Sequence, residues 1–68
     1  MNINETIKKL RMALCLEQAE FGELIDVSKC TICNYEAGRR KPRLPIIRKM
    51  MEIAKKNKVK IELEDFIN

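Results

Sequence analysis

Residues 18–35 read QAEFGELIDVSKCTICNY, and the spacing of their apolar residues decides the fold. Two apolar pairs stand at helical intervals on either side of a short gap, which itself holds a valine. The pattern predicts one helix from about Gln18 to Ile25 and another from about Lys29 to Glu36, with Ser28 as the N-cap of the second. The apolar residues concerned are Phe21, Ile25, Val27, Ile32 and Tyr35.

Two short helices joined by so tight a turn must cross steeply and pack against each other. Phe21 and Ile25 supply one side of that contact, Ile32 and Tyr35 supply the other, and Val27 fills the angle between them. Gly22 lets the helices approach closely. The outward face of the second helix stays free, and the major groove of DNA is wide enough to admit such a helix.

The helical periodicity continues on both sides of this stretch. Upstream, apolar residues from Ile3 to Leu14 predict a first helix of about three turns. Downstream, a helix is expected from near Leu44, with Pro45 in its first turn, to about Lys56. Residues predicted to join the core from these helices are Leu10, Leu14, Ile47 and Met50.

The last residues predict an extended piece over residues 59–63, where polar and apolar residues alternate, and then a short helix from about Leu63. With 68 residues the chain has room for one domain. We therefore expect a compact all-α domain of four to five helices over residues 1–68, with its core at about 4–56.

The net charge of +4 is unevenly distributed along the chain. Residues 28–51 carry seven basic side chains and one acidic one, whereas residues 1–27 carry three basic and five acidic ones. A basic segment in a near-neutral chain indicates a face that binds a polyanion, although a solvated charged surface would give the same pattern.

Other function classes find little support. The chain has no histidine, no glycine-rich phosphate loop and no nucleophile beside a base, so we expect neither catalysis nor a cofactor. The first residues lack a basic start followed by an apolar run, and no stretch is long enough to cross a bilayer. A cytoplasmic protein without membrane contact is expected.

The three cysteines, Cys15, Cys30 and Cys33, are an odd number, which favours reduced thiols in a cytoplasm. Cys30 and Cys33 form a single C-x-x-C and would be neighbours on a helix. A zinc site would need further ligands from a carboxylate or a second chain, so no metal is expected.

Two stretches resemble the phage repressor and Cro family of helix-turn-helix regulators, also called the xenobiotic-response-element type. Residues 16–28, LEQAEFGELIDVS, are similar to the family pattern LTQEELAEKLGVS, and residues 31–42, TICNYEAGRRKP, are similar to TISRWENGKRKP. The similarity extends over roughly residues 4–56. It implies a prokaryotic or phage transcription regulator, repressor-like, that binds a palindromic operator in double-stranded DNA as a homodimer.

The resemblance also implies roles for the matching residues. Outside such a motif, Lys29 and Asn34 would be interpreted as solvated surface, whereas within it the DNA-contacting role is favoured. Glu36 is interpreted as an anchor for the basic loop. The residues that match base-reading positions are Lys29, Cys30 and Asn34. The residues assigned to the DNA backbone are Gln18, Ser28, Thr31, Arg39, Arg40, Lys41 and Arg43, of which Arg43 is within range of a minor groove.

Three residues depart from the family pattern. Glu17 stands where a threonine or serine caps the second helix, and Asp26 replaces the glycine of the turn. Cys30 is unusual at a base-facing position because a thiol is a poor donor, which leaves it an apolar contact with a thymine methyl.

The C-terminal apolar residues follow after the four-helix core is complete, so we expect them to form a dimer interface. They are Ile61, Leu63, Phe66 and Ile67. The alternative, strongest for Leu63 and Phe66, is that they close the core of their own chain. A domain of this fold can also bind a protein, such as a toxin, as an antitoxin-like or anti-repressor module. The basic loop and Gln18 favour DNA.

Overall fold

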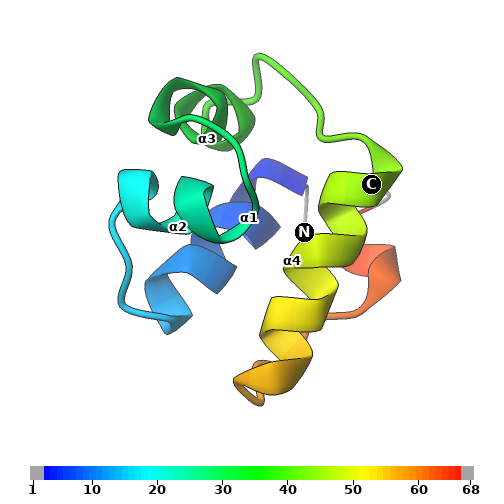
Figure 1. Ribbon diagram of the computed structural model, residues 1–68. Coiled ribbons are helices and arrows are strands. Elements are labelled where there is room, and N and C mark those ends of the chain that lie inside the picture. Colours follow the sequence, from blue (N-terminus) through cyan, green and yellow to red (C-terminus); the bar gives the residue numbers. More distant parts are fainter. Residues whose placement is uncertain (1–2, 67–68) are drawn as a thin grey trace.

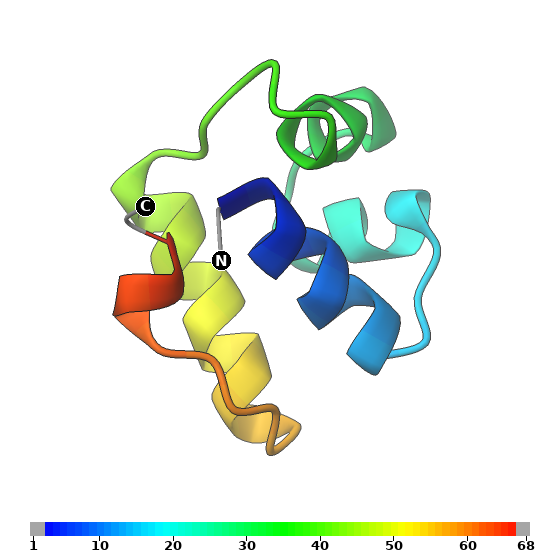
Figure 2. The same ribbon diagram turned by 180° about the vertical axis from the view of Figure 1, so that it is seen from behind.

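Four α-helices and a final 3-10 helix make up the part of the chain, residues 3–66, that the computed structural model describes. In Figures 1 and 2, α2 and α3 lie on one side of α1, and α4 lies on the other. No strand occurs within residues 3–66, which confirms the all-α prediction. The elements are α1 (Ile3–Ala13), α2 (Gln18–Leu24), α3 (Lys29–Glu36), α4 (Leu44–Lys56) and η1 (Leu63–Phe66).

The core lies where the four α-helices meet, and the predicted residues fill most of it. Val27 and Leu14, which were expected in the interior, are half-buried at its edge. The expectation for Phe21, Ile25, Ile32 and Tyr35, and for Leu10, Ile47 and Met50, is confirmed, and Ile7, Ala54 and Phe66 join them.

The turn between α2 and α3 is as tight as its sequence predicts. A Cβ atom on Gly22 would lie 2.5 Å from the carbonyl oxygen of Val27, so only glycine fits there. The Val27 N–H donates to the Gly22 carbonyl at 2.8 Å. Asp26 adopts a φ of 62°, and the Ser28 hydroxyl accepts the Thr31 N–H at 3.1 Å as the N-cap of α3. Gly22 therefore permits contact with the turn backbone before α3.

All four α-helices of the described chain end in the same hydrogen-bonding pattern, the Schellman motif. After α1, for example, the Leu16 N–H donates to the Arg11 carbonyl at 3.2 Å and the Cys15 N–H donates to the Met12 carbonyl at 3.0 Å. Each motif has one residue at positive φ, which is glycine only after α3. The four residues are Cys15 (58°), Asp26 (62°), Gly38 (78°) and Lys58 (58°).

The C-terminal segment folds back onto α1. The Thr6 hydroxyl donates to the Asp65 carbonyl at 2.9 Å, and Phe66 is only 3% exposed. The assignment of Phe66 to a dimer interface is therefore wrong, because its ring packs in the core of its own chain. Ile61 is half-buried, whereas the side chain of Leu63 and all of Ile67 lie outside the described part of the molecule.

Candidate nucleic-acid interface

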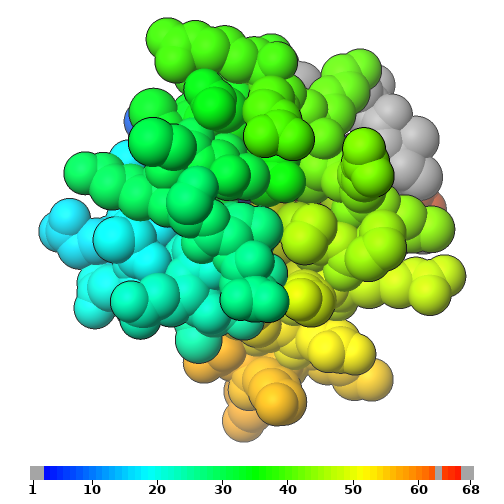
Figure 3. All heavy atoms as spheres, turned by 45° about the horizontal axis from the view of Figure 1, so that its top comes forward, coloured from blue at the N-terminus to red at the C-terminus, as the bar shows by residue number. Residues whose placement is uncertain are grey.

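Helix α3 separates a buried face from an outward face. Ile32 and Tyr35 are buried against the rest of the domain, whereas Lys29, Cys30 and Cys33 are exposed. Figure 3, turned toward this end of the molecule, shows α3 and the loop after it forming one continuous surface. An outward face of this kind is free to contact another macromolecule.

Cys33 was missed among the candidate base-reading residues, although it lies on the outward face of α3. It stands three residues after Cys30 and four after Lys29, and residues at these intervals are neighbours on a helix. Its side chain is exposed, and Ala37, four residues further along, is exposed as well. Helical spacing from Cys30 was the signal that would have identified it. Cys30, Cys33 and Ala37 have small side chains, so a partner can approach this part of the helix backbone closely.

Asn34 lies at the edge of the outward face and is half-buried. Its Oδ1 accepts a hydrogen bond from Arg39 Nη1 at 3.4 Å, a long and exposed contact. The amide nitrogen keeps its two donors, and the oxygen keeps a second lone pair. Asn34 can therefore offer both a donor and an acceptor to a partner while Arg39 stays in place.

Arg11 and Glu36 form an ion pair between α1 and α3. Arg11 Nε and Nη2 donate to the two carboxylate oxygens of Glu36 at 2.6 and 3.1 Å, and Arg11 Nη1 donates to the Leu16 carbonyl at 2.9 Å. The two side chains are 16% and 7% exposed. The hydrogen bonding that Arg11 donates to the Glu36 carboxylate raises the pKa of Arg11 above its usual value.

This geometry corrects the role expected for Glu36, which was interpreted as an anchor for the basic loop. Its carboxylate contacts α1 and α2 instead. The sequence pattern also missed Arg11, because the two residues stand 25 positions apart. Because Arg11 neutralises Glu36, the basic end of the molecule keeps its positive sign.

Gln18, the first residue of α2, joins the same network. Its Nε2 donates to Glu36 Oε1 at 3.2 Å, which fixes the side chain and leaves one amide N–H uncommitted by this bond. Gln18 and Lys29 line one small depression together with Arg11, Glu17 and Ala19. The fold thus brings a predicted phosphate contact next to a predicted base contact.

Helix α2 has a cap despite the departure at Glu17. The Glu20 side chain accepts the Glu17 N–H at 2.9 Å, which is one half of a capping box. Ser28 and Thr31 also interact, because their hydroxyl oxygens lie 2.9 Å apart. Gln18, Ser28 and Thr31 are therefore held in place at the starts of α2 and α3.

The basic loop lies at the same end of the molecule as α3, as Figures 1 and 2 show. Gly38, at a φ of 78°, turns the chain out of α3, and buried Pro42 holds the loop to the domain. The side chains of Arg39, Arg40, Lys41 and Arg43 are all exposed. A row of exposed cations beside a free helix face is the charge pattern of a polyanion-binding surface.

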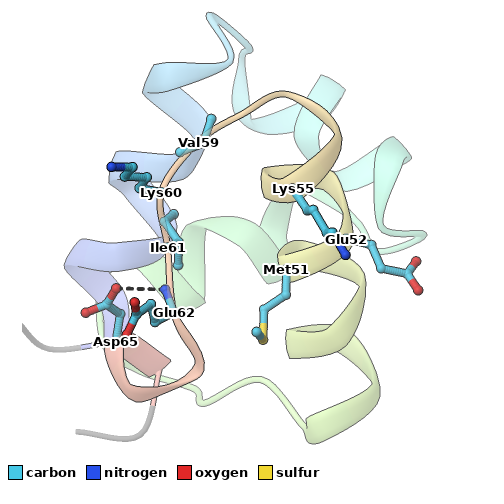
Figure 4. A pocket seen from close by; sticks show the side chains of 8 residues that line it. All are labelled: Met51, Glu52, Lys55, Val59, Lys60, Ile61, Glu62 and Asp65. Atoms are coloured by element: carbon cyan, nitrogen blue, oxygen red, sulfur yellow. Dashed lines mark hydrogen bonds between the residues drawn. The ribbon is translucent and has the colours of Figure 1, made fainter.

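A groove on another side of the molecule runs between α4 and the extended segment before η1. Figure 4 shows Met51 on α4 facing Ile61 across this groove, with Val59 further along the segment. The charged residues on its rim are Glu52, Lys55, Lys60, Glu62 and Asp65. The groove contains Ile61, one of the predicted interface residues.

The thiols of Cys15, Cys30 and Cys33 are free and exposed. Within residues 3–66, no group of three histidine, cysteine or acidic side chains is placed to hold a metal ion. No helix in that same part of the chain is long and apolar enough to span a bilayer.

Comparison with known proteins identifies the family. A family model described as helix-turn-helix matches residues 7–58, the region that holds α1 to α4. No curated protein and no solved structure matched the chain. The match confirms the resemblance drawn from residues 16–28 and 31–42, and it agrees with the close succession of α2 and α3 and with the exposed face of α3. The chain belongs to the Cro/C1-type helix-turn-helix family, a family of DNA-binding regulators of transcription.

Proposed function

We propose that this protein is a repressor-like regulator that binds a palindromic operator as a homodimer, with α3 in the major groove. The proposal depends on one observation: α3 has a buried face and an exposed face. Ile32 and Tyr35 are buried, while Lys29 and Cys30 are exposed on a basic end of the molecule. Occupancy of a promoter by such a dimer would compete with polymerase.

Three side chains of α3 are assigned to base edges. Lys29 donates to the acceptor atoms of guanine, and Asn34 pairs with adenine through its amide oxygen and nitrogen. Cys30, one turn before Asn34, makes an apolar contact with a thymine methyl. The exposure of Lys29 and Cys30 supports these assignments, and so does the spare hydrogen-bonding capacity of Asn34.

The remaining polar residues of the surface are assigned to the DNA backbone. Gln18 donates its remaining amide N–H to a phosphate. Ser28 and Thr31 contact a phosphate as a pair, because their mutual hydrogen bond leaves one of the two hydroxyl hydrogens free to donate. Their support is the local hydrogen bonding that orients all three side chains. The cations assigned to phosphates are the exposed loop residues Arg39, Arg40, Lys41 and Arg43.

A second copy of the chain is the proposed occupant of the groove beside α4. Met51, Val59 and Ile61 offer apolar surface, and the rim carries both acidic and basic side chains. A two-fold interface brings each surface patch against its own copy, so a patch with both charge signs is self-complementary. Phe66 is buried in the core, and the side chains of Leu63 and Ile67 lie outside the described part of the chain. Among the four residues predicted for the interface, Ile61 is therefore the one that the structure leaves as a candidate.

Selection of bound sequences from a random duplex pool tests the proposal. We expect enrichment of an inverted repeat whose half-sites are centred about 34–36 Å apart, one turn of the double helix. A pool that remains random after repeated rounds would contradict it. Stable recovery of the protein with a toxin-like partner, and no enriched sequence, would favour the antitoxin-like alternative.

A further inference from the structure

Two exposed thiols stand on the face of α3 that the proposed function turns toward DNA. Cys30 and Cys33 are both free and exposed, and their i, i+3 spacing makes them neighbours on the helix. The third thiol, Cys15, belongs to the turn after α1. That turn lies at the end of the molecule away from α3 in Figures 1 and 2.

The two thiols of α3 cannot readily join each other. Side chains at i and i+3 of a helix have Cβ atoms about 5–6 Å apart. A disulfide needs Cβ atoms about 3.5–4.5 Å apart, so a Cys30–Cys33 bond would require α3 to unwind. While α3 is folded, the available partner for either thiol is an external molecule.

The charges around the pair favour an anionic partner. Lys29 directly precedes Cys30, and the exposed cations Arg39 and Arg40 follow at the other end of α3. A cluster of cations raises the local concentration of small anions as well as of DNA. The acidic residue of α3, Glu36, is turned inward to Arg11 and away from the thiols.

We propose that Cys30 and Cys33 form a thiol-modification site for anionic small-molecule disulfides, and that modification and DNA binding exclude each other. This inference rests on the proposed function. The thiolate of either cysteine attacks one sulfur of the small disulfide, and a mixed disulfide forms as the original S–S bond breaks. The released small thiolate takes up the proton that the cysteine lost.

The consequence for DNA binding follows from size and charge. Cys30, Cys33 and Ala37 are exposed and have small side chains, so the unmodified helix can approach the base edges closely. A peptide-sized adduct on Cys30 or Cys33 would stand between α3 and those base edges. Its negative charge also opposes the phosphates. Reduction of the mixed disulfide restores the original surface, so the effect is reversible.

Glutathione disulfide is the probe for the test, and each protein is compared with its own reduced form. The affinity for a selected operator duplex is measured by fluorescence anisotropy for the natural protein, for Cys15→Ser and for the double variant Cys30→Ser/Cys33→Ser. We expect the affinity of the first two to fall by about 100-fold or more, toward non-specific binding, and to recover after reduction. The double variant keeps Cys15, and its operator affinity, whatever its value in the reduced form, is expected to stay the same after treatment with glutathione disulfide.

Mass spectrometry locates the adduct, and circular dichroism confirms that the modified protein stays folded. An adduct on α3 that leaves operator affinity unchanged would overturn the inference but not the proposed function. An adduct that unfolds the domain would overturn it too, because the proposed block acts on a folded surface. A reduced protein that binds no duplex would contradict the proposed function, and the inference with it.

Discussion

Glu36 connects α1 and α2 to the helix that carries the proposed DNA-binding surface. Its carboxylate holds Arg11 of α1 and Gln18 of α2 while standing in the last turn of α3. The network sets the position of Gln18 and removes a negative charge from a basic surface. Structural and recognition roles on α3 are thus assigned to different residues, and each role can be tested separately.

Removal of Glu36 should destabilise the fold. Glu36→Ala leaves Arg11 without its partner in a largely buried site, so we expect a loss of about 3 kcal/mol in the free energy of unfolding. The matched control is the double variant Arg11→Met/Glu36→Leu, which removes both charges and should recover much of that loss. Urea unfolding measures both. Equal stability of Glu36→Ala and the natural protein would contradict the structural role.

Asn34 and Arg40 should respond differently to truncation. Asn34→Ala removes the proposed base contact, so we expect a loss of about 1–3 kcal/mol in operator binding and a relaxed preference at one base pair per half-site. Arg40→Ala or Lys41→Ala should weaken binding to all sequences alike and reduce the salt slope by about one. Arg40 is a cleaner control than Arg39, whose side chain contacts Asn34. Uniform weakening by Asn34→Ala would exclude base recognition by that residue.

Each of the four described α-helices ends in a Schellman motif, but a different residue occupies the positive-φ position in each. The Schellman motif requires a residue at positive φ, where a side chain is strained and glycine is not. After α1 and α4 the residues are Cys15 and Lys58, both exposed and both at a φ of 58°. These two positions therefore carry strain that a substitution can relieve.

Cys15→Gly and Lys58→Gly should each stabilise the fold. A left-handed conformation costs a non-glycine residue about 1–2 kcal/mol, and the greater freedom of glycine in the unfolded chain offsets part of the gain. We expect about 0.5–1 kcal/mol from each, seen as a higher midpoint in thermal unfolding. Lys9→Gly, in the exposed interior of α1, is the control and should destabilise by about 1 kcal/mol. If all three variants destabilise the fold, Cys15 and Lys58 are not strained at their positive φ angles.

Gly22→Ala should disturb the α2–α3 angle. The new methyl group would meet the Val27 carbonyl oxygen at 2.5 Å, so the turn must move. Overpacking of this kind costs about 1–3 kcal/mol, and it should lower operator affinity because α3 shifts relative to Gln18. Glu23→Ala, on the exposed side of the same helix, should change stability by less than about 0.5 kcal/mol. Similar unfolding midpoints for both variants would count against the close contact.

The elements that could be predicted from the sequence are those whose signals are local. Helix periodicity, the Ser28 cap and the small residue at Gly22 each act within a few positions, and the structure confirms them. The Arg11–Glu36 pair joins helices far apart in sequence, so no local spacing indicates it. Phe66 was ambiguous for the same reason, because burial of a C-terminal residue depends on where α1 lies.

For the whole molecule, the groove beside α4 is the proposed contact between two copies. Ile61→Glu places a charge in the proposed interface and should shift sedimentation from dimer to monomer. Lys60→Glu alters the charges on the rim at an exposed position and serves as a second variant if Ile61→Glu fails to fold. Met12→Glu, at an exposed apolar residue outside the groove, is the control and should leave the dimer intact. A natural protein that sediments as a monomer at high concentration, with and without DNA, would contradict the dimer.

The proposed function requires that the outward face of α3 recognise a DNA sequence. The most direct test is the ratio of two affinities at physiological salt, one for a selected operator duplex and one for a scrambled duplex of the same length and composition. The account predicts that the operator binds at least about 10³-fold more tightly. Equal affinity for the two duplexes, with the same dependence on salt, would show that the basic surface binds DNA by charge alone and would contradict the account.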